Sequence, residues 1–179
     1  AATLDHPNIL TVYTRGETSG QLWIAMQFVD GRDADAEIRT GTMSPARAAH
    51  IITEVAHALD YAHHRRHIIH RDVKPANFLV AADTDRVYLA DFGIARALDE
   101  TAHLTRTGTV MASIAYASPE SLAGGTVDHR TDIYSLGASA YRLLTGKNPY
   151  AGRTLAAMHL AHLTEPPPSV TAVAPTLPW

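Results

Sequence analysis

Two long stretches with helical apolar spacing most constrain the fold that this sequence can adopt. The first covers residues 44–66, where Ser44 is suited to an N-cap and Pro45 to the first helical position. Its apolar positions are Ile51, Ile52, Val55, Leu59 and Ala62. The second covers residues 128–145 and is followed by Gly146, a residue typical of helix ends. Its apolar positions are Ile133, Leu136, Ala140, Leu143 and Leu144. Both stretches therefore predict helices that bury one side in a core.

Short β-rich runs lie before and between these helices. Residues 9–16 and 21–29 flank the turn-like ETSG and predict a hairpin, and residues 78–81 and 86–90 flank ADTD and predict two further strands. The expected fold class is therefore α+β.

The last part of the chain is expected to be first helical and then irregular. Residues 154–163 predict a third helix. Residues 165–179 are rich in proline, and we expect them to end the chain without a helix.

Composition narrows the class of protein. With 179 residues, 46% of them hydrophobic, the chain is long enough for one soluble globular domain. A net charge of -3 provides no basic field for nucleic acid. The absence of cysteine excludes disulfides and thiolate metal sites and fits the cytoplasm. No apolar run is long enough for a bilayer, so we expect no membrane contact by this segment, whereas an anchor elsewhere in a parent chain is left open.

Polar residues cluster between the two long helices. Asp72 and Asn77, in HIIHRDVKPANFLV, lie on a loop between a helix and a strand, and Asp91 follows the next strand. A strand–loop–strand arrangement can bring these side chains together, and their oxygens are ligands that Mg²⁺ prefers beside substrate phosphates. Asp72 could then orient a hydroxyl nucleophile while Lys74 offers positive charge to a phosphoryl group. The set points to phosphoryl transfer.

The order of these residues resembles a known family. HRD at 70–72, Lys74, Asn77, DFG at 91–93 and SPE at 118–120 resemble the motifs of eukaryotic-type (Hanks-type) protein kinases. HRDVKPAN resembles the Ser/Thr-specific branch, and DVKPAN, DFGIAR and DIYSLG resemble bacterial receptor-type kinases, especially actinobacterial ones. The resemblance implies a protein-kinase-like fold and transfer of the ATP γ-phosphate to Ser/Thr hydroxyls of proteins.

The resemblance also implies how the chain is divided. Residues 1–179 would be a partial kinase domain, in which 1–29 are a two-stranded remnant of the N-terminal lobe and about 27–31 are the hinge. Residues 32–179 would be the mostly helical C-terminal lobe without its last helices. The implied cofactors are ATP and Mg²⁺, with Mn²⁺ as an alternative. The implied partners are protein substrates, and a dimeric parent is left open.

Roles for the catalytic loop follow from the resemblance. It makes Asp72 the catalytic base, Lys74 a contact to the γ-phosphate, Asn77 a second metal ligand and Asp91 the principal one. Arg71 would receive a phosphorylated residue of the activation loop.

The resemblance also assigns the nucleotide pocket and its support. Met26 takes the gatekeeper position, the backbone of Gln27 and Val29 meets the adenine edge, and Leu79 forms its floor. Asp132 would hold the catalytic loop through hydrogen bonds to its backbone.

The activation loop would lie between DFG and SPE. In LTRTGTVMAS, Thr107 is the first choice and Thr105 the second for a regulatory phosphate, although both could be plain loop residues. Ser113 would help to dock the substrate, with Ala112 where the family usually has glycine.

Parts of the family's ATP site have no counterpart in this sequence. The glycine-rich lid, the strand lysine and its helix glutamate are missing, and the two lysines present are Lys74 and Lys147. The arginine that usually pairs with the glutamate of SPE, here Glu120, is missing too. We therefore expect a kinase domain clipped at both ends, with little or no activity on its own and an active parent.

The sequence also allows other interpretations. His63, His67 and His70 could suggest a metal site, but the histidine of HRD packs in the core of the family and the structural interpretation is preferred. A pseudokinase-like binding module without turnover is the alternative function, and the intact Asp72, Asn77 and Asp91 argue against it. A small-molecule phosphotransferase ranks last because it lacks a long activation segment.

Overall fold

The computed structural model describes residues 4–41, 43–92, 114–175 and 177 of the 179-residue chain. Helices and two small sheets alternate along it. In chain order the elements are β1 (Val12–Thr18), β2 (Gln21–Met26), β3 (Gly31–Asp33), α1 (Ala34–Arg39), α2 (Pro45–Arg66), the 3₁₀ helix η1 (Pro75–Asn77), β4 (Phe78–Ala81), β5 (Val87–Leu89), α5 (Pro119–Leu122), α6 (His129–Thr145), α7 (Leu155–Thr164) and α8 (Val170–Val173).

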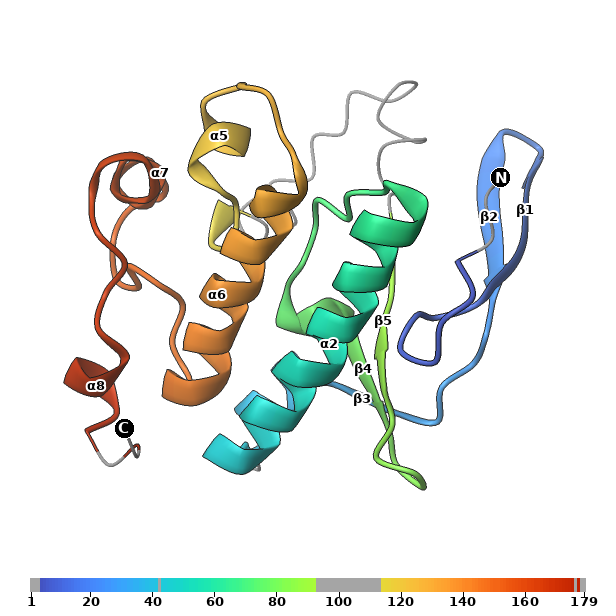
Figure 1. Ribbon diagram of the computed structural model, residues 1–179, viewed down its shortest axis with the longest axis horizontal. Coiled ribbons are helices and arrows are strands. Elements are labelled where there is room, and N and C mark those ends of the chain that lie inside the picture. Colours follow the sequence, from blue (N-terminus) through green and yellow to red (C-terminus); the bar gives the residue numbers. More distant parts are fainter. Residues whose placement is uncertain (1–3, 42, 93–113, 176, 178–179) are drawn as a thin grey trace.

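Helices α2 and α6 lie side by side at the centre of the molecule (Figure 1). Both have the sequence-predicted caps: the Ser44 hydroxyl accepts a hydrogen bond from the backbone of Arg47, and Gly146 ends α6 in the left-handed region with φ 70°. The buried apolar residues of α2 are Ala48, Ile51, Val55, Ala58, Leu59 and Ala62. These two helices were predicted with nearly the same bounds.

The buried side of α6 differs from the predicted stripe. Ile133 is 53% exposed, whereas Leu136 and Leu143 are buried together with the polar Ser135 and Ser139. Each serine hydroxyl donates to the carbonyl four residues earlier, at 3.0 and 2.8 Å, so these polar groups are satisfied without water. Apolar spacing alone could not find this face because serines occupy part of it.

The strands β3, β4 and β5 form an antiparallel sheet with β4 in the middle, behind α2 in Figure 1. Phe78 of β4 pairs with Leu89 of β5, and both are fully buried. Strand β3 pairs Gly31 with Ala81, although residues 30–33 gave no strand signal. Helix α1 was missed as well, because it spans only six residues.

The predicted hairpin is present as β1 and β2, which stand apart from the helices (Figure 1). Ser19 and Gly20 turn the chain with φ of 54° and 76°, as a tight two-residue hairpin turn requires. The first strand begins later than predicted. Ile9 and Leu10 are buried instead, and the Leu10 amide donates to the carbonyl of Leu89 at 3.0 Å.

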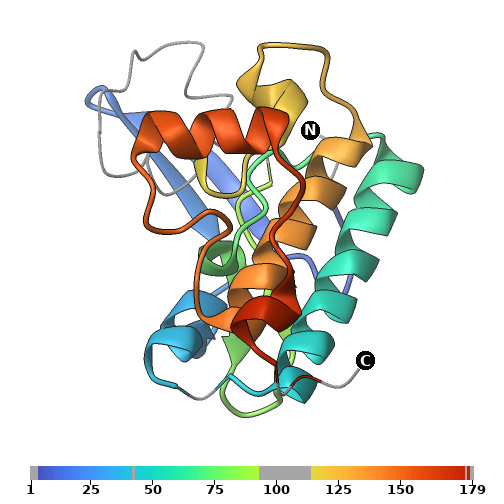
Figure 2. The same ribbon diagram turned by 90° about the vertical axis from the view of Figure 1, so that its left-hand side faces the viewer.

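Helix α7 is present as predicted, and it runs across α6 rather than along it (Figure 2). The proline-rich end was predicted to lack helix, but α8 forms a single turn there. Within the described ranges, no helix combines the length and apolar character needed to cross a membrane.

Candidate active site

The loop that carries Asp72 leaves α2 through two left-handed residues. His67 caps α2 with φ 55°, and Arg71 has φ 70°. Such backbone is disfavoured for residues other than glycine, so the surrounding contacts must hold it. The loop then enters η1 and β4, which places Asn77 at the start of the central strand.

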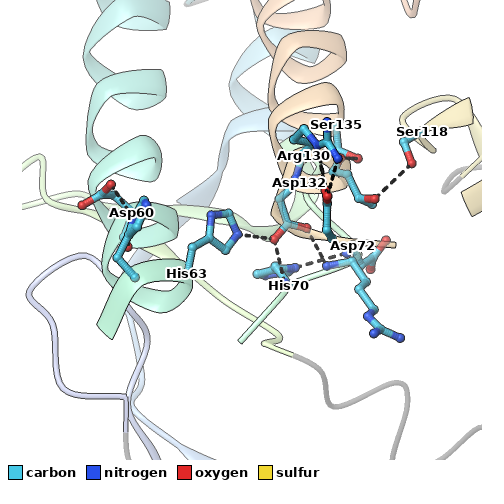
Figure 3. Close-up of polar contacts among 12 residues, drawn as sticks. Asp60, His63, His70, Asp72, Ser118, Arg130, Asp132 and Ser135 are labelled. Carbon is cyan, nitrogen blue, oxygen red and sulfur yellow. Dashed lines mark hydrogen bonds and ion pairs between the residues drawn. The ribbon is translucent and has the colours of Figure 1, made fainter. Parts of the chain in front are cut away.

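Asp132, fully buried in the first turn of α6, holds this loop in place (Figure 3). Its Oδ2 accepts the backbone N–H of His70 at 2.7 Å, and its Oδ1 accepts that of Arg71 at 2.8 Å. His63 Nε2 of α2 lies 2.7 Å from the same Oδ2. One carboxylate therefore joins α2, the loop and α6, and the backbone contacts expected for Asp132 are present.

His70 joins the loop to the end of β5. Its Nδ1 accepts the backbone N–H of Asp72 at 3.2 Å, so Nε2 carries the proton and donates to the carbonyl of Ala90 at 2.8 Å. Burial lowers the pKa of His70. Its ring also lies against Phe92, with centroids 4.5 Å apart. A neutral imidazole thus fixes the two segments that bear Asp72 and Asp91.

Three of the predicted residues meet at the Asp72 carboxylate. Lys74 Nζ lies 2.7 Å from Oδ2 of Asp72. Asn77 Nδ2 donates to the same oxygen at 3.2 Å and to the Asp72 carbonyl at 2.7 Å. Asn77 is buried, whereas Asp72 is half-buried, so the carboxylate stays accessible on one side.

Asp91 follows β5 and is exposed, with its backbone in the left-handed region at φ 64°. The segments of Asp91 and Asn77 are joined directly, because the Ala90 amide donates to the Asn77 carbonyl at 2.9 Å. Among the described residues, none donates a hydrogen bond to Oδ1 of Asn77 or to the Asp91 carboxylate. Amide and carboxylate oxygens in this state fit Mg²⁺ as ligands.

The residues predicted for the adenine pocket lie where β2 ends and in β4. The Gln27 amide donates to the carbonyl of Thr11 at 2.8 Å, which ties the segment after β2 to the segment before β1. Gln27, Val29 and Leu79 are all half-buried, and Met26 is 38% exposed. Thr105, Thr107, Ala112 and Ser113 lie outside the described residues.

The histidines considered for a metal have other contacts. His63 binds Asp132, His70 binds Ala90 and Asp72, and His67 is exposed at the end of α2. In the part of the chain that the structure describes, no group of three or more His, Cys, Asp or Glu side chains is arranged to hold a metal ion.

Two contacts that support the site were not predicted from the sequence. His63 was regarded only as a structural residue, and its contact with Asp132 spans 69 positions, which no local pattern indicates. Glu120 of the SPE motif accepts a hydrogen bond from Thr131 Oγ1 at 2.6 Å. Ser118, fully buried, caps α5 and completes this junction with α6.

Fold and site together define a protein kinase. The family model "Protein kinase domain" matches residues 1–171, and the chain belongs to this family. The kinase-like α+β fold and the resemblance to bacterial Ser/Thr kinases are thereby confirmed.

Named relatives specify the branch. The chain is 55% identical to "Serine/threonine-protein kinase PknJ" of Mycobacterium tuberculosis over 182 residues, which cover 99% of this chain and 31% of PknJ. It is 45% identical to PknF of the same species over 183 residues, which cover 99% of this chain and 38% of PknF. A crystal structure of the M. tuberculosis PknI kinase domain matches with a TM-score of 0.69 and 37% identity, covering 96% of this chain and 59% of that one. The chain thus spans about a third of the length of these curated relatives.

Proposed function

We propose that this chain forms most of the catalytic domain of a Ser/Thr protein kinase, which transfers the γ-phosphate of ATP to hydroxyl groups of protein substrates. The observation that carries the proposal is the meeting of Asp72, Lys74 and Asn77 at one carboxylate oxygen. The names of PknJ and PknF, which are Ser/Thr kinases, support the same activity.

Asp72 is proposed as the catalytic base. Lys74 and Asn77 both contact its Oδ2, and this fixes the orientation of the carboxylate relative to β4. A carboxylate held in this way can orient a substrate hydroxyl and accept its proton. Lys74, whose ammonium lies at the same point, is placed to contact the phosphoryl group during transfer.

Asn77 and Asp91 are proposed as the metal ligands. The amide nitrogen of Asn77 is used by Asp72, so its oxygen is the atom available to a cation. Asp91 is exposed and directly follows Ala90, whose backbone N–H donates to the Asn77 carbonyl. The backbone at Asp91 therefore lies next to the backbone at Asn77. When bound, ATP would supply the phosphoryl group and Mg²⁺ would offset its negative charge. The two side chains orient that group toward Asp72.

The remaining assignments are extensions of this proposal. The backbone of Gln27 and Val29 would bind the adenine edge over Leu79. Residues 1–29 would belong to the N-terminal lobe, about 27–31 to the hinge and 32–179 to the C-terminal lobe. Arg71 is exposed, as a partner for a phosphate on Thr107 or Thr105 must be. Ser113 would dock the substrate. Because the reaction uses Mg-ATP, we propose that it takes place in the cytoplasm.

The test is phosphate transfer from Mg-ATP to a generic protein substrate by the natural protein that carries this chain. The proposal predicts phosphoserine or phosphothreonine in the product and its loss in Asp72→Asn. Asp60→Asn, on the exposed face of α2, is the matched control and should keep the activity. Phosphate transfer that is equal in Asp72→Asn and in the unchanged protein would exclude the proposal.

A further inference from the structure

A histidine outside the catalytic site occupies an unusual position in α7. His162 is 3% exposed, although most histidines reach solvent. It lies between two tyrosines: its Nδ1 is 2.8 Å from the Tyr134 hydroxyl of α6, and its ring meets the Tyr150 ring edge-on with centroids 4.9 Å apart.

The other ring nitrogen of His162 is unsatisfied. Among the buried side-chain nitrogen and oxygen atoms of the described residues, Nε2 of His162 is the one without a hydrogen-bond partner. Burial raises the pKa of Tyr134 to about 12, so near neutral pH its hydroxyl is a proton donor to Nδ1. Nε2 then carries the proton and points at no acceptor. This arrangement can be tolerated only while the imidazole is neutral.

Besides His162, helix α7 is held by Ala161 and by Met158, which is partly buried against Ala115, Tyr116 and Ala138. Ala161 and His162 are its buried residues, whereas Leu160 and Leu163 are 59% and 38% exposed. Its C-terminal end is tied by the Tyr150 hydroxyl, which donates to the carbonyls of Glu165 and Pro166 at 3.2 and 3.1 Å. His162, one of the two buried residues of α7, can bind a proton. The packing of α7 is thus sensitive to a single proton.

We propose that His162 makes α7 a pH-sensitive latch, which packs on α5 and α6 when the imidazole is neutral and releases when it is protonated. Protonation places the additional proton on Nδ1, so the Tyr134 hydroxyl can no longer donate there. The charged ring also has no acceptor at Nε2 unless α7 moves and admits water. The central packing of α2 on α6 involves other residues and does not depend on this proton.

The charged and titratable groups around His162 do not offset its charge. Burial lowers the pKa of His162, and the neighbouring His159 on α7 lowers it further. Glu120 on α5 accepts from Thr131, and Glu165 is paired with Arg153 at 2.5 Å, so neither carboxylate is directed at the imidazole. Burial also raises the pKa of Tyr150, which remains a neutral phenol.

The sign of the effect follows from linkage. Because the packed state holds His162 with a lowered pKa, it binds fewer protons than the released state, whose histidine titrates near its ordinary value of 6.5. The packed state is therefore most stable above that pH and becomes less stable as the pH falls below it. One pH unit of fall multiplies the released fraction by up to about ten.

Hydrogen exchange of the natural protein, corrected for the intrinsic pH dependence of exchange, tests the latch. We expect the protection of the α7 amides to fall about tenfold between pH 7.5 and 5.5, while the α2 amides keep theirs. His162→Phe, an apolar ring without a proton to gain, should make α7 protection independent of pH. His159→Phe, on the same helix, should retain the pH response.

A second measurement does not depend on a folded variant. In the unchanged protein, the NMR titration of the His162 ring should coincide with the loss of α7 protection. Equal α7 protection at both pH values would overturn the proposal, and so would an unchanged pH dependence in a folded His162→Phe. Neither result bears on phosphate transfer.

Discussion

Oδ2 of Asp132 lies 2.7 Å from the backbone nitrogen of His70, although 62 positions separate the two residues in the chain. The same carboxylate accepts from Arg71 and contacts His63. The left-handed conformation of Arg71 next to Asp72 therefore depends on a buried charge in α6.

Replacing Asp132 should thus damage both stability and activity. Asp132→Asn replaces one carboxylate oxygen by an NH₂ group. That group then faces the backbone N–H of Arg71, or that of His70 together with His63, and these buried groups lose their acceptor. We expect a loss of about 3 kcal/mol in the free energy of unfolding. Urea denaturation measures it, and Asp60→Asn, which removes an exposed carboxylate, should change it little. Equal stability of the two variants would contradict the role of Asp132.

The contact between Asn77 and Asp72 gives a second prediction. Asn77→Asp puts a carboxylate where Nδ2 now lies 3.2 Å from Oδ2 of Asp72, and like charges at that distance repel. We expect kcat to fall about 10² to 10⁴-fold. Asn148→Asp is the matched control, because its oxygen can still accept from the Tyr116 hydroxyl. Activity retained in Asn77→Asp would exclude Asn77 from the site.

The neutral state of His70 predicts how stability depends on pH. Its folded-state pKa is lowered, so the unfolded chain binds the additional proton as the pH falls below about 6.5. The free energy of unfolding should be level above that pH and decrease below it, by up to about 1.4 kcal/mol per pH unit for each such histidine. Urea denaturation from pH 5.5 to 7.5 measures the slope.

His6 and His162, whose pKa values are also lowered by burial, contribute in the same direction. A folded His70→Phe should therefore show a shallower slope and not a flat line. Stability that increases toward pH 5.5 would show that His70 is charged in the folded protein.

Two glycines should respond in opposite ways to alanine. A Cβ at Gly31 would lie 1.9 Å from the Val80 carbonyl oxygen, so Gly31→Ala must separate β3 from β4. We expect a loss of about 3 kcal/mol. A Cβ at Gly137, inside α6, meets nothing within 4 Å, so Gly137→Ala should gain about 0.5 to 1 kcal/mol. Thermal unfolding of both variants measures this, and equal shifts would contradict the β3–β4 register.

The sequence was most informative where structure depends on neighbours in the chain. Helices α2, α6 and α7 followed from apolar spacing and caps, and the Asp72–Asn77 contact lies within a single loop. Strand β3 was missed because its pairing depends on the close approach of Gly31 to Val80. Ile133 was misplaced because serines occupy part of the buried face of α6. The His63–Asp132 contact joins two helices distant in the chain, so no periodicity could predict it.

The most direct test of the account is the effect of Asp91→Asn on phosphate transfer. Asparagine adopts the left-handed backbone that Asp91 has at φ 64°, so this change removes a charge without straining the exposed turn. With the natural protein, Mg-ATP and a generic protein substrate, we predict Mg²⁺-dependent labelling of serine or threonine that Asp91→Asn abolishes. Labelling of equal rate in a folded Asp91→Asn protein would contradict the proposed site.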